Sequence, residues 1–340
     1  LPRDDCALVV TTDAMVEGVH FRRETMPGRA LGHKALAVNL SDVAAMGARP
    51  LTALVTLSAP GTAEIAYLQR AWAGMAELAA LHGMTLAGGD TTGSPGPIVV
   101  NVTALGVVPA ARAWRADLAR AEQLLCVTGS LGAATAGLAA LERWGGAAGP
   151  DPEKGPTESD TAAAAGQAEG QDDVGRQSEL VRSALRQVIQ AHRWPVPRLD
   201  VVNALAPLGA RACRDVSDGL AITAHLLSEA AGAGTGVEVD AAAVPIAPAT
   251  RAACAALEID PLEAALFGGE DYELAFTCVE EELPAIGRLL AAAGIQWSVV
   301  GRLLRGSGVW LRPLQGGGRV ALERRGFRHF GGSDGTVAGP

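Results

Sequence analysis

The chain has 340 residues, 49% of them hydrophobic, and a formal net charge of −9. This length and composition allow two domains with buried cores and a cleft between them. The negative charge, without any cluster of Lys or Arg, argues against nucleic acid as a partner, because nucleic-acid binding depends on basic groups that replace counterions.

Two further classes are disfavoured by the residue pattern. No stretch approaches the roughly 18 unbroken apolar residues of a membrane span, so no membrane partner is expected. The five cysteines are scattered and never form a C-x-x-C pair, which disfavours a disulfide framework and a zinc site. A reducing cytoplasm is the expected location.

The first third of the chain predicts alternating strands and helices. The apolar, β-branched run 7–12 predicts a buried strand with Asp13 at its end. Helical spacing over 30–46 and 65–81 predicts two helices. Further strands are expected at 50–58, 84–87 and 98–108. Residues 1–112 are therefore predicted to form an α+β domain of order β-α-β-α-β-β.

A second series of strands and helices starts near residue 124 and predicts an α+β domain over 113–340. Residues 145–179 nearly lack large apolar side chains and are expected to be a disordered insertion, because they cannot offset chain entropy by burial. Apolar spacing from Leu180 predicts that a helix follows. The apolar helix expected over 220–227 comes directly after an acidic, glycine-containing segment.

Acidic residues stand beside glycine, serine or threonine in segments far apart along the chain: Asp4-Asp5, Thr11-Thr12-Asp13, Ser41-Asp42, Gly88-Gly89-Asp90 and Asp215-Val216-Ser217-Asp218-Gly219. Carboxylates gathered without basic partners repel one another, and a hard cation is an economical reason to bring them together. Mg²⁺ bound to a polyphosphate is the expected ligand, because Mg²⁺ takes a few carboxylates and completes its shell with water and phosphate oxygens.

Each segment also has a plainer interpretation. Asp5 and Asp13 are within reach of each other if a tight turn enters the strand between them, or else they are solvated loop residues. Asp42 lies inside a predicted helix and has either a specific partner or an exposed carboxylate. Gly88-Gly89-Asp90 follows the strand 84–87 and either approaches a phosphate or forms a β-turn. The acids of 268–274 need nearby cations or donors unless they form a solvated turn.

In this order, the segments resemble those of the thiamine-monophosphate kinases, which share a superfamily with aminoimidazole ribonucleotide synthetase and selenophosphate synthetase. The similarity extends to the segments 16–21, 34–48, 195–198, 268–274 and 326–330. The resemblance implies two α+β domains with the aminoimidazole ribonucleotide synthetase-like fold. It also implies a homodimer in which the first domains of two subunits pair into a shared β-barrel.

The resemblance further implies ATP-dependent phosphorylation of thiamine monophosphate to thiamine diphosphate, by direct in-line γ-phosphoryl transfer with several Mg²⁺ ions. The implied metal ligands are Asp5, Thr11, Thr12, Asp13, Asp42, Asp90, Asp215 and Asp218. The implied ATP contacts are Gly89, Asp90, Arg115 and Ser217, and the implied contacts of thiamine monophosphate are His20, Glu270 and Phe327. No general base is assigned, because the acceptor phosphate is already ionised near neutral pH.

Two alternatives stay open at this stage. The chain could catalyse another ATP-dependent reaction of the same superfamily, such as closure of a ribonucleotide ring. It could also be a magnesium–nucleotide binding protein without turnover, since the segment 115–122 departs from the family pattern R-x-G-A-x-x-G-D.

Overall fold

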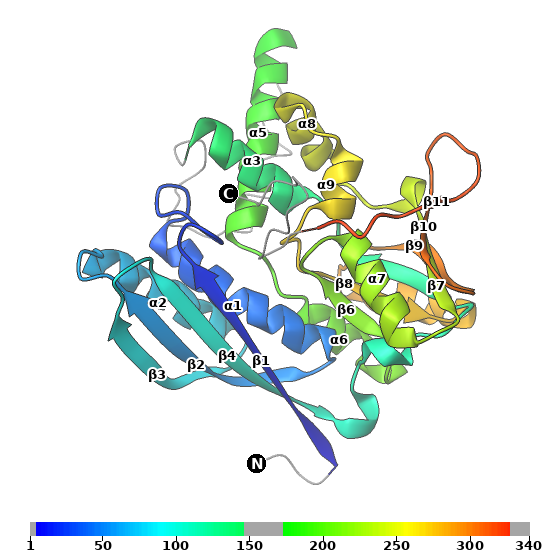
Figure 1. Ribbon diagram of the computed structural model, residues 1–340, viewed down its shortest axis with the longest axis horizontal. Coiled ribbons are helices and arrows are strands. Elements are labelled where there is room, and N and C mark those ends of the chain that lie inside the picture. Colours follow the sequence, from blue (N-terminus) through cyan, green and yellow to red (C-terminus); the bar gives the residue numbers. More distant parts are fainter. Residues whose placement is uncertain (1–4, 146–172, 327–340) are drawn as a thin grey trace.

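The structure, a computed structural model, describes residues 5–145 and 173–326. Two mixed sheets with their helices lie side by side (Figure 1). This α+β arrangement agrees with the predicted fold class. Within the described ranges, no helix is long and apolar enough to cross a bilayer.

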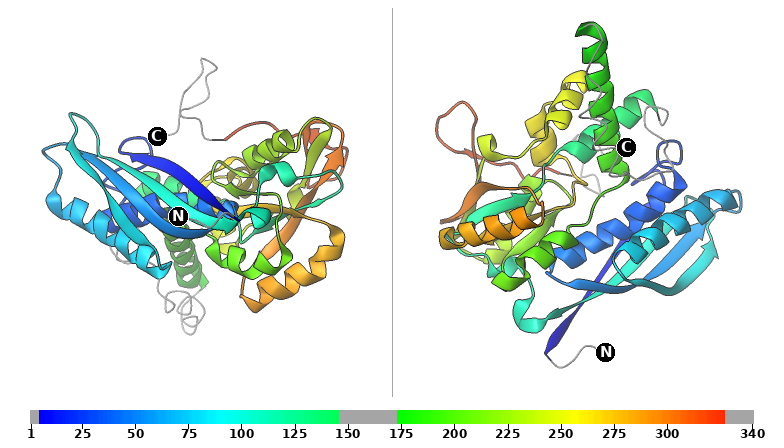
Figure 2. Two further views of the ribbon diagram at one scale, coloured as in Figure 1. Left: turned by 90° about the horizontal axis from the view of Figure 1, so that it is seen from below. Right: turned by 180° about the vertical axis from the view of Figure 1, so that it is seen from behind.

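The first part of the chain has the predicted order of strands and helices. Its elements are β1 (Cys6–Val16), α1 (Gly28–Ala45), β2 (Arg49–Ala59), α2 (Ile65–Leu81), β3 (Thr85–Gly93) and β4 (Val99–Pro109). The four strands form one sheet in the order β1-β4-β2-β3, in which only β2 and β3 are parallel. Helices α1 and α2 lie across one face of this sheet, as the view from behind in Figure 2 shows.

The predicted character of the first strand is wrong in two respects. β1 is not buried on both faces, because Leu8 and Val10 are 48% and 59% exposed on the face opposite α1 and α2. Asp13 does not end the strand either, since it pairs with Val102 in the middle of the β1–β4 ladder. A continuous apolar run predicts a strand that is buried on both faces of its sheet. In this structure α1 and α2 pack on one face of the sheet, and the β1 side chains on the other face are exposed.

The strand predicted at 84–87 is longer than expected and includes Gly88-Gly89-Asp90. β3 extends to Gly93 at the edge of the sheet, so the prediction that these residues follow the strand is wrong. Gly89 has a positive φ, and a Cβ there would lie 1.7 Å from the carbonyl oxygen of Val55 on β2. Strand pairing alone therefore requires glycine at this position.

The second sheet has the order β11-β10-β7-β9-β5-β8-β6 and is antiparallel except for β10 with β7. Its strands are β5 (Leu124–Thr128), β6 (Cys213–Val216), β7 (Thr235–Asp240), β8 (Glu273–Cys278), β9 (Trp297–Arg305), β10 (Val309–Arg312) and β11 (Val320–Ala321). The helices of this part are α3 (Ala133–Trp144), α5 (Asp173–Arg193), α6 (Leu199–Leu205), α7 (Leu220–Ala231), α8 (Pro248–Leu257), α9 (Pro261–Phe267) and α10 (Leu283–Ala292).

Helix α5 begins inside the predicted insertion. The interpretation of 145–179 as disordered is wrong for its last residues, because the helix starts at Asp173. Once the apolar stripe of a helix is packed, each added residue gains a backbone hydrogen bond for the entropy that it loses. Polar residues can therefore lengthen such a helix at its end. Residues 146–172, the main part of that prediction, lie outside the described residues.

Helix α1 lies at the centre of the molecule. It packs on β1, β2 and β4 of its own sheet and contacts α5, α6, β6 and β8 of the second part. One continuous apolar core runs through this contact and includes Leu36, Leu40, Leu274 and Phe276. Polar side chains on α1 are therefore held at the boundary between the two parts.

Candidate active site

Four carboxylates from both parts of the chain gather around α1, and we call them the carboxylate cluster: Asp13 on β1, Asp42 on α1, Asp215 on β6 and Asp218 just before α7. The Thr11 hydroxyl donates a hydrogen bond to the Asp42 carboxylate. The Ser41 hydroxyl donates to Oδ2 of Asp215 at 2.9 Å. Neighbouring residues of one helix thus contact β1 on one side and β6 on the other.

These carboxylates raise one another's pKa values. Burial and then the charges of Asp42 and Asp218 raise the pKa of Asp13 to about 6. Burial and then the charge of Asp42 raise the pKa of Asp215 to about 7. Burial also raises the pKa of Asp42, although the Thr11 hydroxyl and the charge of Arg214 oppose that rise. Negative charge in the cluster is therefore not fully compensated by the protein.

The donor atoms of the cluster suit a hard cation. They are carboxylate and hydroxyl oxygens, the ligands that Mg²⁺ prefers. Among residues 5–145 and 173–326, no group of three or more His, Cys, Asp or Glu side chains is placed so that it could hold a metal ion. A Mg²⁺ ion at the carboxylate cluster would need water and substrate phosphate for its remaining ligands.

The raised pKa of Asp215 predicts a specific pH effect on stability. Its pKa of about 7 lies above the ordinary value of 3.8, so the folded protein binds this proton more tightly than the unfolded chain. Protonated Asp215 therefore contributes to the free energy of unfolding. This contribution is complete below about pH 3.8 and is lost as the pH rises through 7. Without metal, Asp215→Asn should therefore lose less stability than the wild type between pH 4 and pH 8.

Urea unfolding in the presence of a chelator, repeated across this pH range, measures the difference. Asp240→Asn, at the end of β7 in the second sheet, is the matched control and should follow the wild-type curve. Parallel curves for Asp215→Asn and the wild type would contradict the mutual repulsion described here.

Two loops form the part of the site that belongs to the second sheet. The backbone N–H of Glu270 donates to the Ser217 carbonyl at 2.6 Å, and that of Tyr272 donates to the Val216 carbonyl at 3.0 Å. Gly219 has φ +98°, and a Cβ there would lie 2.7 Å from the Gly268 carbonyl. The loop that carries Asp218 is thus fixed by close backbone packing against the segment 268–272.

The acids of this segment each have donors, as expected, and the solvated-turn interpretation is wrong. Glu270 makes an ion pair with Lys34 at 2.8 Å, and Nδ1 of His192, whose pKa is lowered by burial, lies 3.1 Å from the other carboxylate oxygen. Asp271 accepts from the backbone N–H groups of Gly132 and Ala134, at the start of α3. Glu273 accepts a hydrogen bond from the Thr128 hydroxyl of β5 at 2.6 Å. The segment therefore joins α1, α3, α5 and β5.

Some predicted ligands lie away from the cluster. Residues 6–13 pair continuously with β4, so the turn that would bring Asp5 within reach of Asp13 is not formed. Eight residues at about 3.3 Å each separate the two by roughly 26 Å. Thr12 points to the open face of the sheet, where its hydroxyl contacts that of Thr103 at 3.0 Å. Alternation along the strand explains why Thr11 faces α1 and Thr12 does not.

Asp90 and Gly89 are also remote within one chain. Asp90 is exposed on β3, at one edge of the sheet. The row of paired residues that starts at Asp90 crosses β2 at Thr56 and β4 at Asn101, and it reaches β1 at Ala14. Three strand spacings of about 4.8 Å place Asp90 roughly 14 Å from β1. A single chain therefore does not bring Asp90 to the other carboxylates.

The predicted contacts of thiamine monophosphate come from different segments of the chain. His20 lies in the turn after β1, where its Nδ1 accepts from the Val16 N–H at 3.0 Å. Glu270 lies beside the cluster with both carboxylate oxygens engaged. Phe327 lies outside the described residues.

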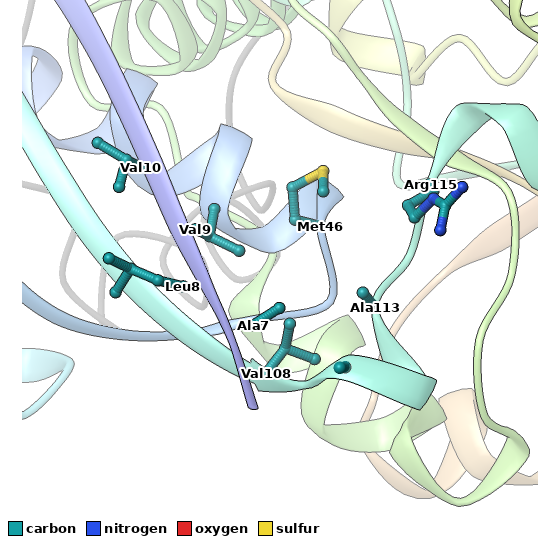
Figure 3. A pocket seen from close by; sticks show the side chains of 9 residues that line it. Ala7, Leu8, Val9, Val10, Met46, Val108, Ala113 and Arg115 are labelled. Carbon is teal, nitrogen blue, oxygen red and sulfur yellow. The ribbon is translucent and has the colours of Figure 1, made fainter. Parts of the chain in front are cut away.

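A pocket of about 460 Å³ lies between the first half of β1 and the connection to the second part. Its lining is apolar except for Arg115, and Met46 stands between the β1 side chains and that arginine (Figure 3). The Arg115 side chain is 55% exposed, and its guanidinium pairs with Asp117. Met46 follows Asp42 by four residues, about 6 Å along α1, so the pocket adjoins the cluster.

Sequence reasoning missed Lys34 and assigned no role to Ser41. Lys34, Ser41 and Asp42 stand at i, i+7 and i+8, on one face of a helix that is buried nearly all round. Polar residues in such a stripe must have buried partners, which is the signal that would have identified them. Tyr272 was also missed; it is 8% exposed with φ +52°, and burial followed by the charge of Glu270 raises its pKa well above 10.

Comparison with known proteins gives a consistent family. Models of the AIR synthase related protein family match twice, the N-terminal domain over residues 1–108 and the C-terminal domain over residues 120–311. The thiamine-monophosphate kinase of Bacillus subtilis (strain 168) is 32% identical over 324 residues, which cover 95% of this chain and 88% of that protein.

Solved structures agree in fold. Thiamine-monophosphate kinase from Stenotrophomonas maltophilia K279a is 32% identical, with a TM-score of 0.73 and coverage of 91% of this chain and 86% of that one. AaThiL complexed with AMPPCP and TMP is 29% identical, with a TM-score of 0.74 and coverage of 97% and 89%. The chain therefore belongs to the AIR synthase related protein family and, within it, to the thiamine-monophosphate kinase group.

Proposed function

We propose that this protein transfers the γ-phosphoryl group of ATP to thiamine monophosphate and so forms thiamine diphosphate. The observation that carries the proposal is the carboxylate cluster, whose charges are incompletely compensated and which lies where the two parts of the chain meet. The kinase relatives support this choice of reaction, and the relative complexed with AMPPCP and TMP supports the pair of ligands.

The chain's own residues fit a direct in-line transfer. Asp13, Asp42, Asp215 and Asp218, with the Thr11 hydroxyl, would hold Mg²⁺, which offsets the repulsion between two phosphate anions. The acceptor phosphate is already ionised, so the protein need only align it with the γ-phosphate. Ser217 would contact the nucleotide near the first turn of α7, whose backbone N–H groups favour anions.

The pocket beside Met46 is proposed to receive the rest of the nucleotide. It adjoins the carboxylate cluster along α1, and its apolar lining suits a planar base. Arg115 at its rim would then contact ATP, as the family resemblance implies. The same pocket suits a nucleotide-binding protein without turnover, so only an assay of the reaction separates these two functions.

A homodimer is proposed to complete the site. The face of the first sheet opposite α1 and α2 exposes Leu8, Val10 and Leu54. Within residues 5–145 and 173–326, its outer strands β1 and β3 have no further strand paired to them. Such a face favours pairing with a second copy. We propose that Gly89 and Asp90 meet the nucleotide of the other copy, because they lie too far from the cluster of their own chain. Asp5 and Thr12 stay predicted ligands that would also need this assembly.

Substitution of Val10 by Asp tests the dimer. The wild type is expected at twice the chain mass of 34.6 kDa in light scattering after size exclusion. Val10→Asp should shift the protein to monomers, because a charge in an apolar interface must be desolvated. Val320→Asp is the control, since Val320 is also an exposed strand valine, on β11. A monomeric wild type, or a Val10→Asp variant that stays dimeric, would contradict the proposed interface.

The acceptor side of the proposal rests on His20, Glu270 and Phe327, the residues that the family resemblance implies. The Glu270 charge is already balanced by Lys34 at 2.8 Å. Selectivity for the cationic thiazolium ring should therefore depend more on an aromatic face, such as that of Phe327, than on this carboxylate.

An acceptor panel tests the proposed reaction. The protein is incubated with ATP, Mg²⁺ and either thiamine monophosphate, thiamine or formylglycinamidine ribonucleotide, and ADP and products are separated by chromatography. Thiamine diphosphate in equal amount with ADP is the expected result, and thiamine should fail because it offers no phosphate to align. ADP formed only with the ribonucleotide would favour ring closure, and no ADP with any acceptor would favour a binding protein.

A further inference from the structure

Three side chains from different elements meet in one buried contact beside the carboxylate cluster. Nζ of Lys34 on α1 lies 2.8 Å from Oε1 of Glu270, and Nδ1 of His192 on α5 lies 3.1 Å from Oε2. The side chains of Lys34 and His192 are 0% and 4% exposed. We call this contact the Lys34–Glu270–His192 clamp.

The charges in the clamp depend on one another. Burial alone would raise the pKa of Glu270, but the Lys34 ammonium and the His192 imidazole outweigh burial and hold this pKa well below its ordinary value. In the described part of the chain, Nζ of Lys34 has no hydrogen-bond partner, and its ion pair is with Glu270. Removing either partner would therefore leave a buried charge without compensation.

The clamp connects the two halves of the carboxylate cluster. On α1, Lys34 shares a face with Asp42. In the second part, the Glu270 N–H holds the Ser217 carbonyl at 2.6 Å, one residue before Asp218. Glu270 and Tyr272 have φ values of +67° and +52°, which are unfavourable for residues with side chains and persist only where the surroundings enforce them.

We propose that Lys34 and His192 are positioning residues that hold Glu270 and thereby fix the spacing between Asp42 on α1 and Asp218 before α7. This inference rests on the proposed function, because it assigns that spacing to the binding of magnesium and nucleotide. Neither residue touches the reacting atoms; both act through Glu270 and its loop. The clamp thus determines how well the cluster binds a magnesium–nucleotide complex.

The test combines binding and stability in one set of variants. Lys34→Met keeps most of the aliphatic stem and removes the charge, Glu270→Gln removes the opposite charge, and a double variant removes both. Calorimetry with Mg²⁺ and AMPPCP, which requires no turnover, measures affinity, and thermal melting measures stability. Arg29→Met is the control, since Arg29 lies on the same helix in an exposed ion pair with Glu77.

Each single variant is expected to melt at a lower temperature and to bind Mg²⁺–AMPPCP at least tenfold more weakly. The double variant should recover most of the melting temperature, because no uncompensated charge remains, but not the affinity, because nothing then fixes the spacing. Arg29→Met should stay within twofold in affinity. Recovery of both properties in the double variant would show a merely structural ion pair and would overturn the proposal.

His192 provides a second test if Lys34→Met does not fold. His192→Asn keeps a polar group near the position of Nδ1, which lies 3.1 Å from Oε2 of Glu270, and should keep most of the affinity, whereas His192→Leu should lose it at least fivefold. Equal affinities in these two variants would overturn the proposal. A wild type that binds Mg²⁺–AMPPCP but forms no thiamine diphosphate would refute the proposed reaction and leave the clamp to be decided by the binding data.

Discussion

Replacement of Asp42 by Asn is expected to lower the turnover of thiamine monophosphate by about 10²-fold to 10³-fold, the range found when one preorganised electrostatic group is removed from an active site. Asp42 accepts from Thr11 and adds its charge to those at Asp13 and Asp215. An amide is a neutral and weaker ligand for a hard cation. Initial rates over a range of Mg²⁺ concentrations measure the loss and show whether excess metal restores turnover.

Stability should change in the opposite direction, which separates loss of function from misfolding. Without metal, Asp42→Asn removes a buried repelling charge, so its melting temperature should exceed that of the wild type. The rise in melting temperature caused by Mg²⁺ should be smaller than in the wild type. Asp240→Asn, on β7, should keep wild-type turnover. Unchanged turnover in Asp42→Asn at limiting Mg²⁺ would remove this residue from the metal site.

Replacement of Gly32 by Ala is expected to cost about 3 kcal/mol of unfolding free energy, at the upper end of the range for overpacked cores. A Cβ at Gly32 would lie 1.6 Å from the backbone oxygen of Ala71, so α1 and α2 would have to move apart. Because α1 also carries Lys34, Ser41 and Asp42, turnover should fall with stability. Urea unfolding measures the free energy.

Gly287→Ala provides the matched control, because Gly287 lies in α10 and a Cβ there would only touch Trp297 at 3.8 Å. Alanine is the better helix former, so this variant should gain about 0.5–1 kcal/mol. If Gly32→Ala were as stable as Gly287→Ala, the close contact between α1 and α2 would not exist in solution.

The sequence predicted the helices of the first part well, because their apolar periodicity is long and regular. Helix α2 begins at Ile65 and ends at Leu81, as predicted, and α1 differs from prediction only at its ends. Strand ends were predicted less well. Asp13 and Asp90 lie within strands, since polar residues on an open or edge strand resemble a loop.

The sequence did not show how the residues of the candidate site are arranged. Asp42 was expected to have a specific partner, and the Thr11 hydroxyl is that partner. The residues that join the two parts of the chain, Lys34 and His192, could not be assigned from local pattern, because their shared partner Glu270 is distant in sequence. The sequence shows which side chains need partners, whereas only the fold shows which partners they find.

The most direct test of the central claim follows the labelled γ-phosphoryl group of ATP through a single turnover. The protein, in excess over ATP, is mixed with Mg²⁺ and thiamine monophosphate, quenched at intervals and analysed by chromatography. The account predicts that label leaves ATP and enters thiamine diphosphate at the same rate, with none attached to the protein, and that Asp42→Asn slows both processes equally. Label that passes through a phosphorylated protein, or that appears only as inorganic phosphate, would contradict direct transfer at the carboxylate cluster.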